Sequence, residues 1–266
     1  MEIAADARNR KRAPAHPVAS ALLAIGALVV SACAASSPSG LGEFRRSLNT
    51  TEHGYRVIED PTGAAQARMV ERFEVRPGDC GIEAGYNDCQ NDRERSELAQ
   101  VPGGRIPVGT EAWYGWDLYM PANFPNVFPT KTVLGQFHQT GSHPLFMFLH
   151  TGDGLVLDNQ IDRSAQDLLI PEAQLRGRWH RVMVFARWRK DATGLLRVFV
   201  DGDLKSEYRG ATVTAHEVYL KYGVYRAFIS RFKTARNTDA VPAQIAYFAN
   251  VASAPTREDL FTAHTR

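Results

Sequence analysis

The sequence predicts an all-β domain made of two packed sheets, a two-sheet sandwich or jelly roll. Most of the chain falls into short runs of apolar or alternating residues, the pattern of half-buried strands. Turn-forming residues separate these runs, and helical signals are limited to 171–175 and 257–262. Many short strands with regular turns are typical of sandwiches and jelly rolls.

The expected strands can be placed in chain order. Single strands are expected at 69–75, 112–120, 132–138, 145–150, 154–157 and 243–251. The clearest hairpin joins 179–189 to 195–200, because apolar residues alternate in its first arm and Asp191-Ala192-Thr193-Gly194 supplies a turn. A second turn, Asp201-Gly202, ends the following strand.

Residues 1–32 have the features of a secretory signal. A basic start precedes a nearly apolar stretch at 18–30, which is too short to span a bilayer, since spanning takes ~20 residues. Val30-Ser31-Ala32-Cys33 resembles the bacterial lipobox, which predicts that Cys33 is lipidated; ordinary cleavage within Ala32-Cys33-Ala34 is the alternative. The protein is therefore expected to be exported, either lipid-anchored at the bacterial cell envelope (periplasmic or cell surface) or secreted.

After the expected signal, the amino-acid composition divides the chain into a short tether and one domain. Residues 33–50 are small and polar and predict a flexible tether, and 51–266 form one domain without internal repeats. Removing 1–32 takes away four basic and two acidic side chains, so the formal net charge falls from +2 to zero. No global field then attracts nucleic acid. We expect a monomer that meets the membrane through its lipid anchor alone.

The cysteine count supports export. With Cys33 assigned to lipid, Cys80 and Cys89 remain as an even pair, which predicts a disulfide in an oxidising compartment. Closing so short a loop contributes about 2–3 kcal/mol. Two reduced thiols are the alternative, and zinc needs more ligands than this pair supplies.

Three polar segments carry the candidate chemistry: Arg95-Ser96-Glu97-Leu98, Gln136-Phe137-His138 and 219–226. Because strand side chains alternate, Gln136 and His138 are expected on one face, with Val133, Gly135 and Phe137 on the other.

In the third segment, the same alternation places Tyr219, Lys221, Gly223 and Tyr225 together. A guanidinium, an amide, an imidazole and a phenol facing one groove would suit a reaction on an acidic substrate. Taken singly, each has an ordinary alternative, such as a surface ion pair for Arg95 or a solvated histidine at 138.

Together the segments resemble a known set. The three match, in this order, the hallmark segments of alginate-lyase-like polysaccharide lyases. The context around 113–121, 179–181 and 200–202 is similar to the heparin lyase I and glucuronan lyase group, and the resemblance spans roughly 55–252. It implies a concanavalin-like β-jelly roll. Departures from the family pattern at Phe137, Leu220, Tyr222 and Arg226 weaken an assignment to alginate itself.

The resemblance also implies the reaction, β-elimination at a 4-linked uronic acid. A proton leaves C5, the C4–O bond breaks, and an unsaturated uronate remains. Arg95 and Gln136, with help from His138, would neutralise the carboxylate as charge develops. Tyr225 would transfer the protons, with His138 as the alternative base. An unperturbed tyrosine titrates near ~10, so Tyr225 needs cationic neighbours, for which Lys221 and Arg95 are candidates.

The expected substrate is an acidic polysaccharide. The residues implied to bind it are Arg93, Glu97, Tyr219, Lys221 and Arg226. Glucuronate and mannuronate undergo syn elimination, which one tyrosine can perform, whereas guluronate and iduronate need anti elimination with His138 as base. The residues can serve either case. Our order is a glucuronan-like polymer, then alginate, then sulfated glycosaminoglycans.

No cofactor is required by this chemistry, although a structural calcium ion is compatible with it. Asp60, Asp201 and Asp203 could contribute to such a site, but their spacing is not diagnostic.

Two other classes stay open. A glycoside hydrolase needs two carboxylates about 5–10 Å apart, and no strand carries a suitable pair. A non-catalytic carbohydrate-binding domain could stack sugars on its tryptophans, which are Trp113, Trp116, Trp179 and Trp188.

Overall fold

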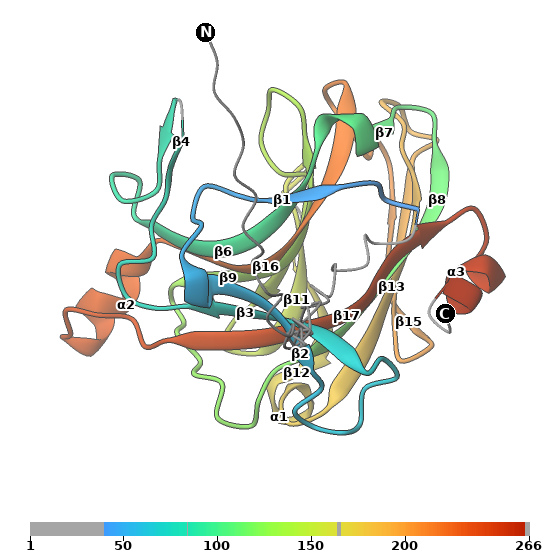
Figure 1. The fold of residues 1–266 in the computed structure, drawn as a ribbon. Coiled ribbons are helices and arrows are strands. Elements are labelled where there is room, and N and C mark those ends of the chain that lie inside the picture. Colours follow the sequence, from blue (N-terminus) through green and yellow to red (C-terminus); the bar gives the residue numbers. More distant parts are fainter. Residues whose placement is uncertain (1–39, 84, 164–165, 264–266) are drawn as a thin grey trace, which may run out of the picture. The chain divides into compact units, whose positions relative to one another are not determined.

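The computed structural model describes residues 40–83, 85–163 and 166–263, so the expected signal and Cys33 lie outside the described residues. Two large antiparallel sheets build the described domain, which confirms the predicted jelly-roll sandwich (Figure 1). Within these ranges, no helix is both long enough and apolar enough to cross a membrane.

The first sheet, sheet A, has seven strands. In spatial order they are β15 (Asp203–Arg209), β14 (Leu195–Val200), β13 (Trp179–Arg187), β8 (Glu111–Tyr119), β17 (Gln244–Ala254), β3 (Met69–Val75) and β2 (Tyr55–Glu59). The predicted hairpin is β13–β14, whose register pairs Val184 with Val198.

The second sheet, sheet B, has eight strands. Its main path runs β1 (Phe44–Arg46), β6 (Arg93–Gln100), β16 (Glu217–Ala227), β9 (Lys131–Gln139), β10 (Phe146–His150), β11 (Gly154–Asn159) and β12 (Asp167–Pro171), and β7 (Ile106–Pro107) pairs with β16.

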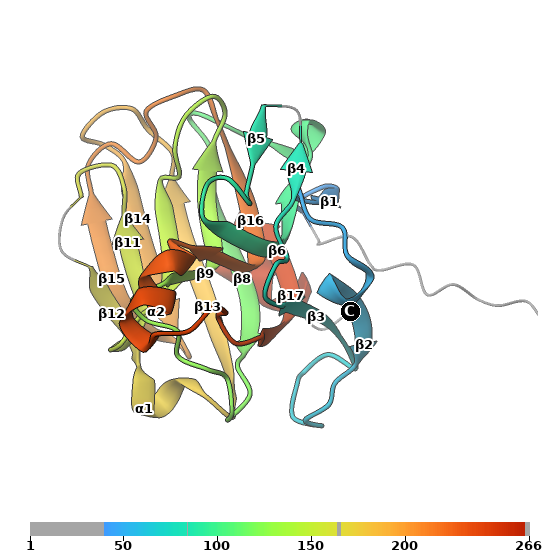
Figure 2. The same cartoon turned by 90° about the vertical axis from the view of Figure 1, so that its left-hand side faces the viewer.

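The remaining elements are short. A separate hairpin, β4 (Ile82–Glu83) and β5 (Tyr86–Asn87), projects from the sheets (Figures 1 and 2). The helices are α1 (Glu172–Leu175), α2 (Ile229–Arg236) and α3 (Arg257–Ala263), and 3-10 turns cover Glu52–Gly54 and Pro102–Gly104. Helices α1 and α3 lie where short helices were expected, whereas α2 was not predicted.

The core lies between the two sheets. Sheet B contributes Phe137 and Tyr222 to it, and sheet A contributes Phe73 and Phe248. The Tyr222 ring centroid is 5.6 Å from that of Phe73 and 5.4 Å from that of Phe248. Each such side chain contributes about 1.5–3 kcal/mol on burial, so this layer holds the inner face of sheet B against sheet A.

Two bulges at the centre of sheet B correct one predicted face. The β16–β9 register shifts between Tyr222 and Tyr225, and the β9–β10 register shifts between Phe148 and Leu149. Val133 therefore packs with Tyr225 in a small cluster on the outer face, away from the main core. The prediction that Val133 shares the face of Phe137 is wrong, because an extra residue in a bulge reverses the alternation.

The predicted tether, 33–50, also needs correction in its described part. Strand β1 pairs with β6, and Leu41 is buried. The Phe44 ring meets the Tyr222 ring edge-on at 5.3 Å. Residues 40–50 thus belong to the fold, because two apolar side chains in a mostly polar segment find places in the core.

Candidate active site

The three polar segments lie on neighbouring strands in the centre of sheet B, in the order β6, β16, β9. The register places Lys221 opposite Gln136, and Tyr225 opposite Arg95. We call the face of these strands that is turned away from sheet A the site face. It carries Arg93, Arg95, Glu97, Val133, Gln136, His138, Tyr219, Lys221 and Tyr225. The structure therefore brings the predicted catalytic residues together on one face.

Gly223 explains how β16 passes so close to β6. Its φ is +131°, and a Cβ atom there would lie 2.3 Å from the Ser96 carbonyl oxygen. A side chain could not be accommodated without moving β6. The glycine of the third segment is thus needed for the close packing of the two strands that carry Arg95 and Tyr225.

Glu97 is the hub of the site face and is 1% exposed. Its carboxylate accepts hydrogen bonds from Gln136 Nε2 at 2.7 Å and Arg95 Nη1 at 3.1 Å, and Lys221 Nζ lies 2.8 Å away. Burial by itself would raise the pKa of Glu97, but Lys221 and Arg95 outweigh it and lower the pKa. The ionised carboxylate orients these three side chains.

Arg95 is clamped by Asp88, a residue that the sequence reasoning missed. The fully buried Asp88 accepts hydrogen bonds from Nε and Nη2 of Arg95, both at 2.6 Å. With the bond to Glu97, this leaves one N–H group on each of Nη1 and Nη2. The guanidinium edge that we expected to grip a substrate carboxylate is therefore occupied. The position of Asp88 beside Cys89 is the one sequence signal that pointed towards it.

Tyr225 packs its ring against Arg95, whose Cζ lies 4.3 Å from the ring centroid. Among the described residues, its hydroxyl has no hydrogen-bond partner. Burial raises the pKa of Tyr225 to about 12, although Arg95 and Arg93 act to lower it. The second cationic neighbour of Tyr225 is therefore Arg93, a role that was expected for Lys221. The phenol of the free protein is protonated at neutral pH.

His138 stacks on Tyr219, with the ring centroids 5.0 Å apart. Its Nδ1 lies 2.9 Å from both the backbone nitrogen and the carbonyl oxygen of Gln139. Burial, with a contribution from Lys221, lowers the pKa of His138 to about 4. The imidazole is therefore neutral at pH 7. In the described ranges, Nε2 has no protein partner and is not a buried atom.

The residues expected to bind substrate differ in their burial and in their partners. Tyr219 is half-buried, and Cζ of Arg105 lies 5.4 Å from its ring centroid. Arg105 was not among the predicted site residues. Lys221 is buried and paired with Glu97. Arg93 is half-buried, and its guanidinium lies 4.3 Å from the Phe228 ring.

Arg226 is not brought to the site. It is fully buried on the opposite face of β16, where it pairs with Glu94 and donates to the Pro242 carbonyl oxygen at 2.6 Å. Because Arg226 directly follows Tyr225 in a strand, its side chain leaves on the other side. The prediction that it binds substrate is corrected accordingly.

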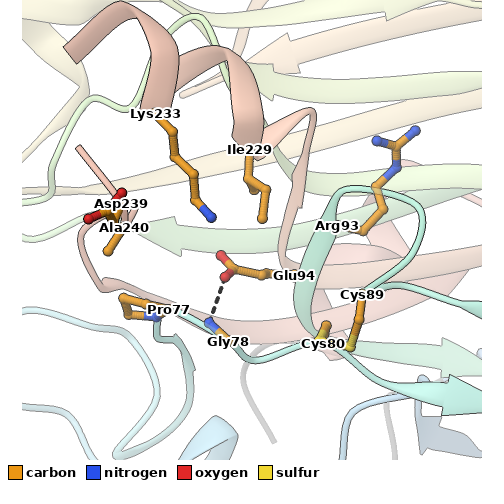
Figure 3. A pocket seen from close by; sticks show the side chains of 10 residues that line it. All are labelled: Pro77, Gly78, Cys80, Cys89, Arg93, Glu94, Ile229, Lys233, Asp239 and Ala240. Carbon is orange, nitrogen blue, oxygen red and sulfur yellow. Dashed lines mark hydrogen bonds between the residues drawn. A yellow bond between two sulfur atoms is a disulfide. The ribbon is translucent and has the colours of Figure 1, made fainter. Parts of the chain in front are cut away.

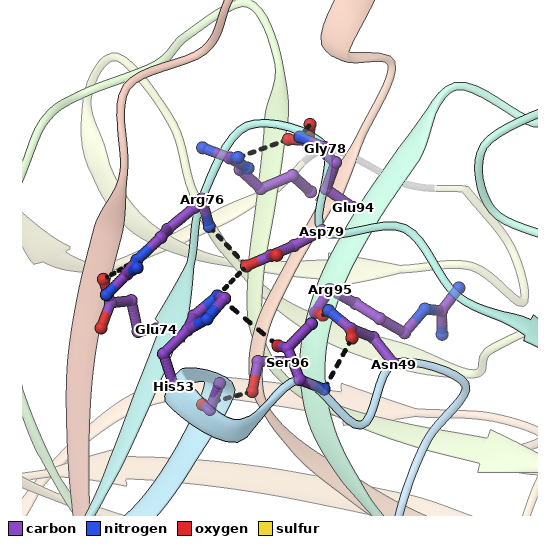
Figure 4. A network of polar contacts seen from close by, with 12 residues as sticks. Asn49, His53, Glu74, Arg76, Gly78, Asp79, Glu94, Arg95 and Ser96 are labelled. Carbon is purple, nitrogen blue, oxygen red and sulfur yellow. Dashed lines mark hydrogen bonds and ion pairs between the residues drawn. The ribbon is translucent and has the colours of Figure 1, made fainter.

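A polar network behind β6 supports the Arg95 backbone (Figure 4). Asn49 Nδ2 donates to the Arg95 carbonyl oxygen at 2.9 Å, and the Arg95 nitrogen donates to the Asp79 carbonyl oxygen at 2.9 Å. The Asp79 carboxylate lies 2.7 Å from His53 Nε2 and accepts from the Arg76 nitrogen. Figure 4 shows the Arg95 side chain pointing away from this network. The network therefore holds the strand and leaves the guanidinium to the site face.

The structure contains the predicted Cys80–Cys89 disulfide. It borders a hollow, open to solvent, between the turn after β3, the start of β6 and α2 (Figure 3). The Lys233 ammonium and the Glu94 carboxylate face this hollow. None of the predicted catalytic residues lines it, so it lies beside the site face at the Arg93 end.

The described residues hold no group of three or more His, Cys, Asp or Glu arranged to bind a metal ion. Two carboxylates considered for calcium have protein partners: Asp60 accepts from Thr62 and the Ala65 nitrogen, and Asp201 lies 2.8 Å from His180 Nδ1. We therefore assign no calcium ligands.

The two-sheet jelly roll is shared with solved lyases. It resembles endo-beta-1,4-glucuronan lyase from the fungus Trichoderma reesei, with 18% identity, 81% of this chain and 93% of that chain covered, and a TM-score of 0.56. It also resembles a doubly substituted variant of family 7 alginate lyase A1-II′ in complex with substrate, with 14% identity, 80% of this chain and 93% of that chain covered, and a TM-score of 0.54. A third similar structure is alginate lyase AlgAT5 from polysaccharide lyase family 7, with 16% identity, 82% of this chain and 90% of that chain covered, and a TM-score of 0.52.

The family assignment comes from the sequence match. The polysaccharide lyase family model matches residues 39–252, so the chain belongs to this family. Nothing among curated proteins matches the chain significantly. The protein is thus a polysaccharide lyase, in agreement with the resemblance noted from its three polar segments.

Proposed function

We propose that this lyase cleaves a 4-linked uronic-acid polysaccharide by β-elimination and leaves unsaturated uronate ends. The observation that carries the proposal is the convergence of Arg95, Gln136, His138 and Tyr225 around the buried Glu97 on one face of sheet B. These groups supply a cation, an amide, an imidazole and a phenol on the same face. Elimination beside a carboxylate needs groups that neutralise the carboxylate and groups that transfer the protons.

Local charge supports an anionic substrate. The cations on or over the site face are Arg93, Arg95, Arg105 and Lys221, and the anions beside them are Asp88, Glu97 and Glu217. Four cations against three anions leave a local charge of +1. The whole mature chain is neutral by comparison. A uronate carboxylate would balance this excess. Gln136 Nε2 already donates one N–H to Glu97 and keeps a second N–H that can bind the uronate carboxylate. Nη1 and Nη2 of Arg95 each keep one N–H for the same purpose.

Proton transfer is assigned to Tyr225, with His138 as the alternative base. A phenol with a pKa of about 12 is ready to protonate the leaving oxygen at neutral pH. As a base it must act through its phenolate, about one molecule in 10⁵ at pH 7. His138 is already neutral and able to accept a proton, and its role would correspond to anti elimination.

A glucuronan-like polymer remains our first candidate, followed by alginate and then sulfated glycosaminoglycans. The glucuronan and alginate lyases among the structural neighbours support the fold, and the substrate is our inference. The local excess of a single positive charge suits a polymer with one carboxylate per sugar better than a heavily sulfated one. Export through the N-terminal signal, with or without a lipid on Cys33, is part of the same proposal.

The tryptophans do not support a sugar-binding module without catalysis. Trp116 and Trp188 lie in the core between the sheets. Trp113 packs with Phe199 and Met183 on the other side of sheet A, and Trp179 stacks on Tyr119. The site face carries none of them.

The experiment is a panel of purified polyuronates followed by the ultraviolet absorbance of the new double bond. We expect activity on at least one polymer. Tyr225→Phe is expected to lower turnover by about 10³-fold and to keep substrate binding within a few-fold. Tyr247→Phe, on sheet A, is the matched control and should behave as wild type, since Tyr247 contacts Tyr119 rather than the site face.

Two results would contradict the proposal. Reducing ends without ultraviolet absorbance would indicate hydrolysis, and binding without any product would indicate a carbohydrate-binding domain.

A further inference from the structure

The disulfide loop, residues 80–83 and 85–89, stands beside the site face and contains Asp88, which holds Arg95. It carries the β4–β5 hairpin, which projects from the sheets (Figures 1 and 2). The hairpin consists of two residue pairs, Ile82 with Asn87 and Glu83 with Tyr86. A two-stranded hairpin of this size is not stable by itself. Its position therefore depends on the disulfide and on contacts made by the loop.

Asp88 ties this loop to the reacting centre. Its carboxylate holds Arg95 through two hydrogen bonds of 2.6 Å. Its nitrogen donates to the Gly81 carbonyl oxygen, and its own carbonyl oxygen accepts from the Arg93 nitrogen. Because Cys89 is the next residue, the disulfide and the Asp88–Arg95 pair hold the same end of the hairpin in place.

Tyr86 is the residue that this anchoring presents. Its ring centroid lies 5.9 Å from Cζ of Arg95, the atom that lies 4.3 Å from the Tyr225 ring. Tyr86 is nevertheless 43% exposed. Within the described residues, no other ring packs on it and its hydroxyl has no hydrogen-bond partner. An exposed aromatic ring thus stands next to the proposed catalytic phenol.

We propose that Tyr86 is a substrate-binding residue that stacks on the sugar unit next to the reacting uronate, and that the disulfide positions it. This inference rests on the proposed function. A pyranose presents C–H groups on its faces and polar groups at its edge, so it suits an aromatic ring placed beside a guanidinium. Tyr86 and Arg95 provide this combination.

The test is equilibrium binding of oligouronates of the best polymer to the full chain carrying Tyr225→Phe, which is expected to slow turnover about 10³-fold. Adding Tyr86→Ala is expected to weaken binding about tenfold, the usual scale for losing one aromatic contact. Adding Tyr86→Phe in its place should restore most of that loss, because the ring does the stacking. In the otherwise wild-type enzyme, Tyr86→Ala should raise KM much more than it lowers kcat.

Ile82→Ala provides the control on the same hairpin. Ile82 is 67% exposed and pairs with Asn87, whereas Tyr86 pairs with Glu83, so alternation places Ile82 on the other face of the hairpin and its truncation should leave binding unchanged. Loss of binding by Ile82→Ala as large as that by Tyr86→Ala would overturn the proposal, since it would indicate general disruption of the hairpin.

The disulfide is tested with the double change Cys80→Ser and Cys89→Ser. It should weaken binding to a similar extent, and adding Tyr86→Ala to it should cause little further loss. Full additivity of the two losses would refute the positioning by the disulfide. If the Tyr225→Phe protein binds oligouronates equally well with and without Tyr86→Ala, the inference is refuted while the lyase assignment stays intact. If the wild type forms no unsaturated product from any polyuronate, the proposed function fails first.

Discussion

Two carboxylates on opposite sides of β16 show what decides charge inside this protein. Glu97, on the site face, contacts Lys221, and Glu71, between the sheets, accepts from the hydroxyls of Tyr222 and Tyr55. Burial disfavours the charge of both. Cations lower the pKa of Glu97, whereas burial raises the pKa of Glu71 to about 7, since two phenols compensate only in part. Neighbouring charge, rather than depth, keeps a carboxylate ionised.

The phenols differ in the same way. Tyr225 lies against Arg95 and Arg93, which limit the rise of its pKa to about 12. Burial and Glu71 raise the pKa of Tyr222 well above its ordinary value. Of these two tyrosines, three residues apart in the chain, Tyr225 is the one whose surroundings oppose a phenolate less. Strand alternation assigns them to these different environments, because β16 keeps a regular register with β6 from Tyr222 to Tyr225.

The largest expected effect on stability is that of Glu97→Gln. It leaves Lys221 and Arg95 buried without their shared anion, so the free energy of unfolding should fall by about 3–5 kcal/mol. Turnover of the folded fraction should fall by about 10²-fold, because Gln136 and Arg95 lose the group that orients them. Chemical denaturation and steady-state kinetics measure the two effects. An unchanged kcat would remove Glu97 from the positioning role.

The pH dependence of kcat/KM compares Tyr225 with His138. If the Tyr225 phenolate is the base, kcat/KM should rise about tenfold per pH unit from pH 7 to 10, since its pKa is about 12. We expect this slope in the wild type and in His138→Gln. A profile that is flat above about pH 5, with an acid limb near pH 4, would assign the base to His138 instead, because its pKa is about 4.

Glu71 should make stability fall as pH rises. Its pKa is raised in the folded state, so the folded chain keeps a proton that the unfolded chain loses between pH 4.5 and 7. The free energy of unfolding should decrease over this window by up to roughly 3 kcal/mol and then level off. Denaturation of wild type and Glu71→Gln at several pH values isolates this contribution. Parallel pH curves would show that Glu71 does not titrate as described.

The smallest effect concerns the two arginines on opposite faces. Arg93→Ala should raise KM about fivefold with little change in stability, since the side chain is half-buried and stacks on Phe228. Arg226→Lys should do the reverse and lower stability without changing KM, because Arg226 is buried against Glu94. A KM effect of Arg226→Lys in the folded protein would restore its predicted role in binding.

Residue patterns could predict much of this molecule because the information is local. Alternation identified strands such as β3 and the β13–β14 hairpin, and turn residues located their ends. Alternation also predicted that Gln136 and His138 share a face. It failed at Val133, because a bulge depends on the register with neighbouring strands, which no sequence window contains.

Helix α2 shows the same limit. No side chain of its own caps its start, and Asp92, from a distant turn, accepts from the nitrogens of Phe228 and Ser230. The partners of Arg95 are a similar case. The ordinary alternative for Arg95 was a surface ion pair, yet Arg95 is buried, Asp88 makes a bidentate pair with it and Glu97 accepts one further hydrogen bond.

The amino-acid sequence by itself determined the strand pattern, the disulfide pair and the set of groups available for catalysis, because alternation, turn chemistry and motif spacing act over a few residues. The tertiary structure decided which cations surround Tyr225, which carboxylate clamps Arg95 and that Arg226 leaves the site. Protonation and free hydrogen-bonding capacity depend on burial and on partners brought from elsewhere in the chain, and these exist once the sheets have packed.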